Sequence, residues 1–501
     1  MEQQKTEKEP VLAYRSVNIG FGGKPVIRNL DVSLGRGEIL GIVGESGSGK
    51  TTLLRAAAGL LGRGGQVSGG IWFQGRNLAV LPEKEMRRVR GAGIGMIFQD
   101  AEASLCPVRT VGSQILEAMA AHGHLRKEQA KEQALAMFEA LRLDGGVRIW
   151  DSYPMELSGG MNQRVCIAMA ALLKPAVLLA DEPTSALDKA AGKQAADELL
   201  RLRERFGTAV ILVTHDIGLA SSLADTLLVL KEGQTAEYGP AAQVSARPRN
   251  EYTRRLFVAS VGQNVRQTPE REGGRVLLEA RDLTRMFPRK GKPDLAAADH
   301  IGLSLREGEA LGLTGASGCG KSTLARMLAR LLEPAAGSVR LEGREITGLR
   351  GRELRRVYQE IQMVFQSPAG SFDPRRTIGS SIGETLANQG VSRKERKKQA
   401  AELLSRCGLP EELADRYPHE VSGGQCQRAA IARALAARPK ILICDEITSA
   451  LDVTAQQQIM ELLQSLKETR QMAFLFISHD PALVRAFCSR VLVMREGRIL
   501  E

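Results

Sequence analysis

The chain is poor in aromatic residues, and its few cysteines form no recognisable pattern. Phe, Trp and Tyr make up 4% of its 501 residues, which leaves few rings for stacking the bases of single-stranded nucleic acid. The seven cysteines include no C-x-x-C pair, which argues against a disulfide framework and against a cysteine zinc site. We therefore expect reduced thiols, as in a cytosolic protein.

Long apolar runs are absent from the sequence. The most apolar stretch, residues 165–180, is interrupted by Lys174 and Pro175. Spanning a bilayer takes roughly 18–20 consecutive apolar residues, and no stretch of the sequence approaches that length. If the protein serves a membrane process, other chains must supply the membrane-spanning part.

Acidic residues are fewer than basic residues, so the net charge at neutral pH is +12. Basic residues cluster at 87–90 and at 393–398. Such clusters could bind nucleic acid, or they could be solvated helix faces or surfaces near anionic lipid. We favour solvated helix faces or surfaces near anionic lipid over a nucleic-acid surface, and expect no nucleic-acid partner.

Two segments, residues 44–51 and 315–322, fit the phosphate-binding pattern G-x-x-x-x-G-K-[ST]. Each follows an apolar run (39–43 and 310–313) and precedes a helix-like stretch (53–61 and 324–332). Glycines let successive backbone N–H groups turn inward around an anion, and the helix N-terminus adds partial positive charge. Lys50 and Lys321 would reach the terminal phosphates, and Thr51 and Ser322 would reach Mg²⁺. The candidate loop residues are Gly44, Ser46, Gly47, Gly49, Lys50, Thr51 and Thr52, and Gly315, Ser317, Gly318, Gly320, Lys321, Ser322 and Thr323.

The chain is an internal duplication. Ser-Gly-Gly at 158–160, Asp-Glu at 181–182 and His215 each recur 264 residues later, at 422–424, at 445–446 and at His479. We predict a first domain at 1–257, a polar linker at 258–275 and a second domain at 276–501. In each copy, apolar strands alternate with helical patterns, which predicts an α/β fold with a mostly parallel sheet and ligands at the carboxyl ends of its strands.

The most specific motifs are LSGGMNQR at 157–164 and VSGGQCQR at 421–428. They resemble the signature of ABC ATPases, and the resemblance covers nearly the whole chain twice. It implies two P-loop domains, each with a RecA-like core, an antiparallel β subdomain and a helical insert. Two departures are minor, because neither removes a chemical group: Val421 replaces the usual leucine, and Ile447 replaces the usual proline after Asp-Glu.

The resemblance also assigns roles to residues outside the loops. The aspartates would hold Mg²⁺, the next carboxylates would polarise the attacking water, and the histidines would contact the γ-phosphate and that water. The glutamines after short strands would sense Mg²⁺ and γ-phosphate, and an aromatic ring would stack on adenine. These residues are Asp181, Glu182, His215, Gln99 and Phe21 in the first half, and Asp445, Glu446, His479, Gln366 and Phe287 in the second. Segments 185–188 and 449–452 resemble the D-loops.

In ABC ATPases, the signature of one domain faces the phosphate loop of the other, and two ATP molecules are sandwiched between them. The resemblance therefore implies crossed sites in this chain, with ATP and Mg²⁺ as cofactors. Lys50 would share an ATP with the second signature, and Lys321 with the first. The signature residues are Ser158, Gly159 and Gly160, and Ser422, Gly423, Gly424 and Gln425.

The flanking segments narrow the resemblance to importers of dipeptides, oligopeptides and nickel. YPME at 153–156, YPHE at 417–420 and the segment 248–256 are similar to that branch. Its members act with two permease subunits and an extracytoplasmic solute-binding protein, at the cytoplasmic face of a bacterial-type membrane. The compact halves favour nickel or metallophore cargo slightly over peptides, with opine-type cargo also open.

The alternative is a soluble tandem ABC ATPase that acts on ribosomes or nucleic acid. Ribosome-acting members have a long, charged helical linker, whereas residues 258–275 are few and contain glycine. Excinuclease-type members need zinc-binding cysteine pairs, which the sequence lacks. Tandem sugar-importer ATPases have a similar length but differ around the glutamine and signature segments.

Overall fold

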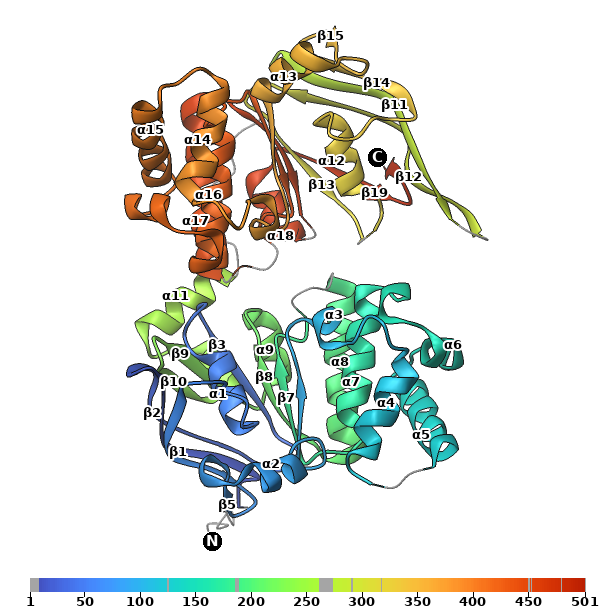
Figure 1. Ribbon diagram of the computed structural model, residues 1–501, viewed down its shortest axis with the longest axis vertical. Helices are drawn as coiled ribbons and strands as arrows, with labels where there is room; N and C mark the ends of the chain where they lie inside the picture. Colours follow the sequence, from blue (N-terminus) through green and yellow to red (C-terminus); the bar gives the residue numbers. More distant parts are fainter. Residues whose placement is uncertain are drawn as a thin grey trace. The chain divides into compact units, whose positions relative to one another are not determined.

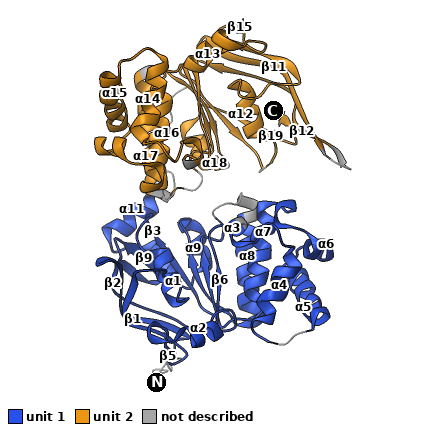
Figure 2. Cartoon of the chain, in the orientation of Figure 1, with its two compact units in different colours: residues 1–260 blue, residues 261–501 orange. Residues whose placement is uncertain are grey.

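The computed structural model describes residues 9–123, 126–184, 189–260, 274–289, 292–316, 318–448, 451, 453–478 and 480–500. The chain divides into two compact units, residues 1–260 and 261–501 (Figure 2). Within the described ranges, no helix is both long and apolar enough to cross a membrane.

The first unit is built on a six-stranded sheet with the order β10-β9-β3-β8-β7-β6. All neighbouring strands are parallel except β9 and β10. The strands are β3 (Ile39–Gly44), β6 (Ile94–Ile97), β7 (Val177–Asp181), β8 (Ala209–Val213), β9 (Thr226–Lys231) and β10 (Gln234–Pro240). A second, antiparallel sheet has the order β2-β1-β4-β5. Its strands are β1 (Leu12–Phe21), β2 (Lys24–Leu34), β4 (Gly65–Phe73) and β5 (Arg76–Asn77).

The helices of the first unit form two groups. In Figure 1, α3 to α8 gather on one side of the parallel sheet, and α1 lies between that sheet and the antiparallel one. The helices are α1 (Lys50–Ala57), α2 (Glu83–Val89), α3 (Ala101–Ser104), α4 (Val111–Ala120), α5 (Lys127–Ala140), α6 (Gly146–Asp151), α7 (Gly159–Ala171), α8 (Lys189–Phe206), α9 (Ile217–Leu223), α10 (Ala241–Ala246) and α11 (Glu251–Ser260).

The second unit repeats this architecture. Its six-stranded sheet has the order β16-β17-β18-β13-β19-β20, and its antiparallel sheet has the order β12-β11-β14-β15. The strands are β11 (Val276–Arg289), β12 (Lys292–Arg306), β13 (Ala310–Thr314), β14 (Ala336–Leu341), β15 (Arg344–Glu345), β16 (Ile361–Val364), β17 (Ile441–Asp445), β18 (Ala473–Ile477), β19 (Arg490–Arg495) and β20 (Arg498–Leu500). The helices are α12 (Lys321–Leu328), α13 (Gly351–Glu360), α14 (Ile378–Asn388), α15 (Arg393–Arg406), α16 (Gly423–Leu435), α17 (Val453–Arg470) and α18 (Pro481–Phe487).

Both faces of each parallel sheet are buried, which explains why its strands are continuous apolar runs. Successive residues of β7 alternate between two cores. Leu178 and Ala180 pack with the helices α4 to α8, whereas Val177 and Leu179 pack with α1 and the antiparallel sheet. The two cores pack on opposite faces of the sheet and hold the carboxyl ends of its strands in place. The predicted α/β class, with parallel cores, antiparallel subdomains and helical inserts, is confirmed.

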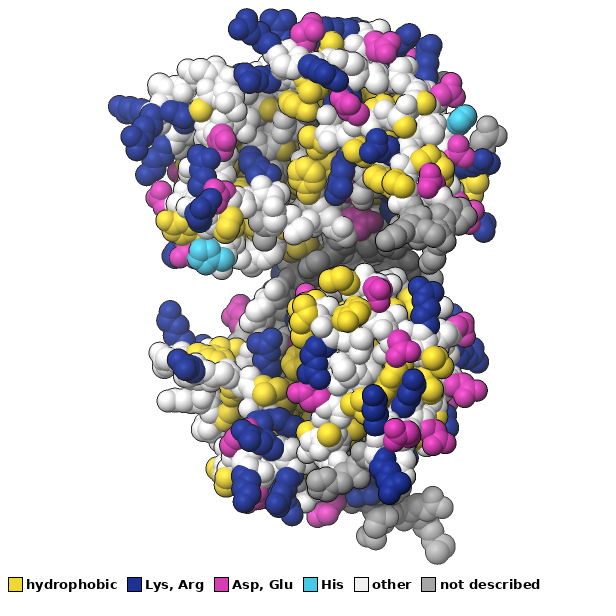
Figure 3. All heavy atoms as spheres, turned by 45° about the vertical axis from the view of Figure 1, so that its right-hand side comes forward, with side chains coloured by type: hydrophobic (Ala, Val, Ile, Leu, Met, Phe, Trp, Pro, Cys, Tyr) yellow, Lys and Arg dark blue, Asp and Glu magenta, His cyan; other side chains and the backbone are white. Residues whose placement is uncertain are grey.

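Charged side chains are distributed over the surface of both units. Figure 3 shows basic groups interspersed with acidic ones on one face of the molecule. Arg87 and Arg90, from the first basic cluster of the sequence, both pair with Glu83. Arg87 is exposed on α2, whereas Arg90 follows that helix, is half-buried and also donates to the carbonyl oxygens of Ala58 and Gly59.

Candidate functional site

The first phosphate loop joins β3 to α1 and has a backbone that requires glycine. Gly47 and Gly49 have φ angles of 79° and 98°, in the region where only glycine is free of strain. A Cβ on Gly49 would lie 2.4 Å from Cδ1 of Ile27. The loop is therefore held close to β2, and its backbone is shaped before any ligand arrives.

Lys50 is the first residue of α1 and is buried. Its Nζ donates hydrogen bonds to the carbonyl oxygens of Gly44 and Glu45, both at 2.7 Å. The ammonium group thus lies inside the loop, where a phosphate bound by the loop N–H groups would meet it.

The second loop repeats this geometry between β13 and α12. Gly318 and Gly320 have φ angles of 77° and 110°, and a Cβ on Gly320 would lie 1.9 Å from the carbonyl oxygen of Ala297. Nζ of Lys321 donates to the carbonyl oxygen of Gly315 at 2.8 Å. Ser317, a predicted member of this loop, lies outside the described residues.

A hydroxyl and a carboxylate meet beside each lysine. Thr51 Oγ1 donates to Asp181 Oδ1 at 3.0 Å, and Ser322 Oγ donates to Asp445 Oδ1 at 3.0 Å. Both aspartates are the last residues of buried strands. Burial raises the pKa of both carboxyl groups, although the hydroxyl hydrogen bonds oppose it. The pairing gathers hard oxygen donors of the kind that Mg²⁺ prefers.

Glu182 follows Asp181 in a strained turn. Its φ angle is 47°, and its backbone N–H donates to the carbonyl oxygen of Val213 at 2.8 Å. The left-handed region costs a residue with a side chain roughly 1–2 kcal/mol. Glu446 has the same conformation, with φ of 50° and a bond from its N–H to the carbonyl oxygen of Ile477 at 3.0 Å. The repeated strain fixes both carboxylates in one direction, as is common at functional sites.

The Glu182 carboxylate lies between two predicted partners. Gln99 Nε2 donates to Glu182 Oε2 at 3.0 Å, and His215 Nδ1 lies 3.4 Å from the same oxygen. Burial alone would raise the Glu182 pKa, but the hydrogen bond and charge of His215 outweigh it and lower that pKa. Burial likewise opposes protonation of His215, yet its contact with Glu182 raises the histidine pKa. The two groups therefore favour an ion pair.

The second unit brings the equivalent groups together. Gln366 Nε2 donates to Glu446 Oε2 at 2.8 Å, and Lys321 Nζ lies 3.7 Å from Glu446 Oε1. The loop lysine and the carboxylate therefore occupy one site. His479 and the segments 185–188, 449–450 and 452 are outside the described residues, so their predicted roles stay predictions.

The two signature segments begin helices in the helical inserts. Ser158 caps α7 by accepting a hydrogen bond from the N–H of Met161, and Ser422 caps α16 by accepting one from the N–H of Gln425. The Gln425 side chain bonds back to the N–H of Ser422 at 3.0 Å. The glycines that follow are Gly159 and Gly160 in α7, and Gly423 and Gly424 in α16. Each signature thus presents a helix N-terminus, which favours an anion.

The two predicted adenine-stacking rings lie on the antiparallel sheets. Phe21 is the last residue of β1 and is half-buried, opposite Lys24 and Gly65 in the strand registers. Phe287 is half-buried in β11, and the Arg285 guanidinium lies 5.3 Å from its ring centroid. Both rings retain enough exposure to take part in stacking.

One further contact at the first loop was not foreseen from the sequence. The N–H of Glu45 donates to the hydroxyl of Tyr252 at 3.2 Å, and Lys231 Nζ lies 5.2 Å from the Tyr252 ring centroid. Tyr252 belongs to α11, about two hundred residues after the loop. The sequence segment 248–256 was noted only for its resemblance to importers, because no local pattern indicates where a distant helix packs.

Comparisons with known proteins show the family of this chain. The family model "ABC transporter" matches residues 27–185 and 298–449. The glutathione import ATP-binding protein GsiA of Pectobacterium atrosepticum is 40% identical over 513 residues, which cover 95% of this chain and 82% of that protein. The protein of the same name from Escherichia coli K12 is 40% identical over 533 residues, which cover 98% of this chain and 86% of that protein. The chain therefore belongs to the ABC transporter ATPases and carries two ATP-binding domains of that family in tandem.

Proposed function

We propose that this chain hydrolyses ATP at two sites to drive the import of small peptides through separate membrane permeases. The observation that carries the proposal is the repeated cluster of a buried loop lysine, a hydroxyl–aspartate pair and a glutamine-bound glutamate. Both units have the complete cluster, so both sites are proposed to be competent.

Each cluster has a donor set that fits ATP and Mg²⁺. The glycine loops would cradle the phosphates, and Lys50 and Lys321 would exchange their loop carbonyls for phosphate oxygens. Thr51 and Asp181 would hold Mg²⁺ in the first unit, and Ser322 and Asp445 in the second. Gln99 and Gln366 would complete these metal sites. Mg²⁺, when bound, neutralises the charge of the phosphates.

The carboxylates that follow the aspartates are proposed as the catalytic bases. The contacts of Glu182 with His215 and Gln99 lower its pKa despite burial and so favour the carboxylate, which can accept hydrogen bonds from an attacking water and orient it. The Gln99 amide donates a hydrogen bond to the same carboxylate. It would hold Glu182 in the orientation that binds the attacking water until the γ-phosphate accepts that hydrogen bond instead. Glu446, Gln366 and His479 would act alike in the second unit.

The two sites are proposed to be crossed between the units. Each helix N-terminus at Ser158 or Ser422 would face the nucleotide held by the other unit, and would supply partial positive charge to the γ-phosphate. Within one unit, the signature belongs to the helical insert and the phosphate loop to the sheet. The signature and the phosphate loop of one unit therefore belong to different subdomains. Closure of the two units would bring the signature of each unit to the phosphate loop of the other.

The transported substrate is proposed from the relatives rather than from the site. Two relatives with 40% identity are named for glutathione import, which makes a small peptide a better candidate than nickel, a metal chelate or an opine. The chain would work at the cytoplasmic face of a bacterial cell membrane, with two permease subunits and an extracytoplasmic solute-binding protein.

Uptake of labelled peptide tests this proposal. Cells that lack the gene would be complemented with the native chain, or with a chain carrying both Glu182→Gln and Glu446→Gln. We expect labelled glutathione to accumulate only with the native chain. Normal uptake in the double variant would contradict the ATPase assignment. If the native chain restores nickel uptake but not glutathione uptake to cells that lack the gene, the proposed substrate is wrong. If the chain co-purifies with ribosomes instead of permeases, the importer proposal is wrong.

A further inference from the structure

A cavity of about 470 Å³ lies in the helical insert of the second unit. It is bounded by α14, by α15 and by the turn η4 (Glu411–Asp415). It shares no residue with the nucleotide clusters described above. Its size falls within the range of small-molecule sites, about 300–1,000 Å³.

The same region of the first unit provides an internal comparison. The N–H of Val111, at the start of α4, donates to the carbonyl oxygen of Ser152 at 3.0 Å. The N–H of Ile378, at the start of α14, donates to the carbonyl oxygen of Arg416 at 2.9 Å. Ser152 and Arg416 are therefore equivalent positions, and so are the residues two places before them, Trp150 and Ala414.

Trp150 occupies in the first unit part of the region where the second unit has the cavity. Its side chain is buried, and a Cβ on Gly112 would lie 2.4 Å from its Cε2 atom. Lys131 Nζ lies 5.7 Å from the centroid of its ring. The equivalent of Gly112 is Gly379, which lines the cavity together with Ala414. A Cβ on Gly379 would lie 2.8 Å from the Cβ and from the carbonyl oxygen of Ala414, so Ala414 packs on this glycine and the open space lies beside it, toward α15.

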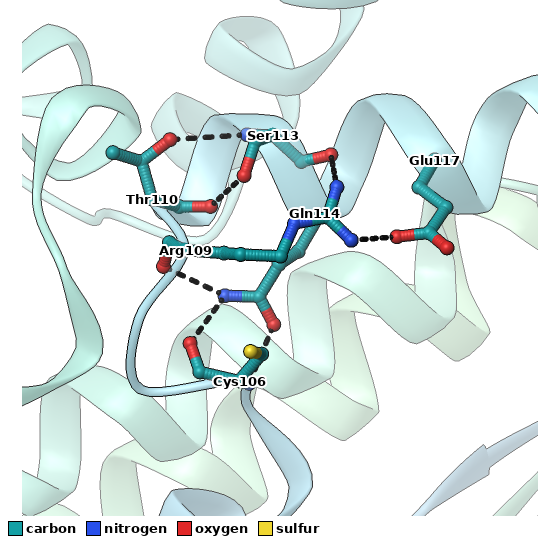
Figure 4. A network of polar contacts seen from close by, with 6 residues as sticks. All are labelled: Cys106, Arg109, Thr110, Ser113, Gln114 and Glu117. Carbon is teal, nitrogen blue, oxygen red and sulfur yellow. Dashed lines mark hydrogen bonds and ion pairs between the residues drawn. The ribbon is translucent and has the colours of Figure 1, made fainter.

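The rim of the cavity retains the polar arrangement of the first unit. Figure 4 shows Arg109 reaching Glu117 across the first turns of α4. In the second unit, Arg376 donates to Glu384 at 2.6 Å in the same way. Both residues line the cavity, so it opens beside an intact helix start and does not result from a local disruption.

The second unit adds positive charge that the first unit lacks. Helices α5 and α15 both have 14 residues, so Ala130, the fourth residue of α5, is replaced by Arg396 in α15. The Nε atom of Arg396 is buried, and no hydrogen-bond partner for it is present in the described part of the chain. Such an atom is costly unless a ligand satisfies it.

The charges that line the cavity do not cancel. Glu384 is paired with Arg376, and Asp415 lies 3.6 Å from Lys397. Arg393 and Arg396 also line the cavity, and neither forms an ion pair with any residue that the structure describes. Two cations are therefore available to an anionic group.

We propose that this cavity binds a small organic anion in which a carboxylate or phosphate is attached to a planar ring. The ring lies on the small residues beside Ala414, in the region that Trp150 partly occupies in the first unit. The acidic group faces Arg393 and Arg396. The site is specific to the second unit, because the first unit has neither the opening nor the arginine.

Binding of 4-fluorobenzoate to the full chain, followed by fluorine NMR, tests the proposal. A saturating non-hydrolysable ATP analogue occupies the phosphate loops, so that they do not compete for the anion. We expect saturable binding to the native chain. Ala414→Trp places a ring in the cavity, and Arg396→Gln replaces the arginine by a neutral polar side chain. Each variant should weaken binding of 4-fluorobenzoate about tenfold or more. Fluorobenzene, which lacks the acidic group, should bind as weakly, and acetate, which lacks the ring, should displace 4-fluorobenzoate only weakly.

Three outcomes would overturn the inference. They are the absence of saturable binding at about 10 mM probe, equal binding by the Arg396→Gln chain, and equal binding by a folded Ala414→Trp chain. If Ala414→Trp does not fold, as judged by circular dichroism, Arg396→Gln decides alone. Trp72→Phe in the first unit is the matched control and should leave binding unchanged.

Discussion

At the scale of single residues, the two glutamates after the buried strands carry the most direct consequences. Each is held in a left-handed turn, and each accepts a hydrogen bond from the glutamine that follows a neighbouring strand. A backbone strained in the same way in both units is a physical reason to assign both residues the same role.

Replacing Glu182 or Glu446 by Gln should slow hydrolysis while ATP still binds. Loss of the base costs about 10²–10⁴-fold in rate, whereas the neutral amide lessens repulsion of the γ-phosphate. Single-turnover hydrolysis and ATP binding would be measured in parallel, with Glu232→Gln as a control outside the cluster. A double variant that hydrolyses at the native rate would remove both residues from catalysis.

The Glu182–His215 contact predicts a pH dependence. The histidine pKa is raised above its ordinary value of 6.5, so its contribution to stability is complete below that pH and is lost as pH rises through the raised pKa. The glutamate pKa is lowered below 4.5, so its contribution is present above that pH and is lost as pH falls through the lowered pKa. The pair is therefore most stabilising between about pH 4.5 and 6.5.

In the nucleotide-free Glu182→Gln chain, the His215 pKa should fall, because burial then acts without the carboxylate. Titration of the histidine ring proton by NMR measures this pKa, and Glu446→Gln in the other unit is the matched control. A His215 pKa that does not change in Glu182→Gln would mean that the contact is absent in solution.

At the scale of elements, α11 is joined to the phosphate loop by the Tyr252 hydroxyl. Tyr252→Phe removes one hydrogen bond, worth about 0.5–1.5 kcal/mol, and leaves a loop N–H without that partner. We expect a modest loss of stability together with weaker ATP binding. Tyr238→Phe is the matched control, because Tyr238 donates to the carbonyl oxygen of Ser33, away from the loop. Equal effects of both variants on ATP affinity would exclude a role for Tyr252 at the loop.

Trp150 belongs to α6, packs against α4 and is buried, so its removal should cost more stability than removal of an exposed tryptophan. Trp150→Ala removes a buried ring and should lower the free energy of unfolding of the first unit by about 3–5 kcal/mol. Trp72, which is 36% exposed, is the control and should cost far less when changed to Ala. Chemical denaturation followed by circular dichroism gives both values. A similar loss for the two variants would contradict the packing.

The strands of the parallel sheets were the most predictable elements. The apolar runs at 39–43 and 310–313 form the strands β3 and β13, because buried parallel strands are continuous apolar runs. The expected helices at 53–61 and 324–332 begin earlier, at Lys50 and Lys321. Each helix starts inside the phosphate loop, where the left-handed glycine before the lysine sets its first turn.

Contacts between residues of the recognised motifs could be predicted from the sequence. Contacts that involve segments without a motif could not. The pairing of Thr51 with Asp181 follows from the motifs, since both belong to the loop and strand ends of one sheet edge. The sequence alone does not show that Ala414 stands where the first unit has Trp150, because the two positions become equivalent only when the helices are compared in the structure. A single tryptophan in a helical pattern is usually part of the core.

At the scale of the whole molecule, the crossed arrangement of the two ATP sites remains a proposal with a sharp test. Vanadate trapped with ADP, followed by photocleavage, should cut the loop at Lys50 together with the signature at Ser422. Cuts at Lys321 should accompany cuts at Ser158. Cleavage confined to the loop and signature of one half would refute the sandwich, and nucleotide-free chain gives the background.

The duplication described above places both halves on one polypeptide, joined through the predicted linker at 258–275. A short tether converts association into an intramolecular step, with an effective concentration on the order of millimolar. For the proposed crossed sites, closure would then not depend on how much of the protein the cell makes, and the two halves are always produced in equal number. A mutation that inactivates one half is present in every molecule of the protein. The two halves are covalently joined, so an intact half from another molecule cannot be exchanged for it.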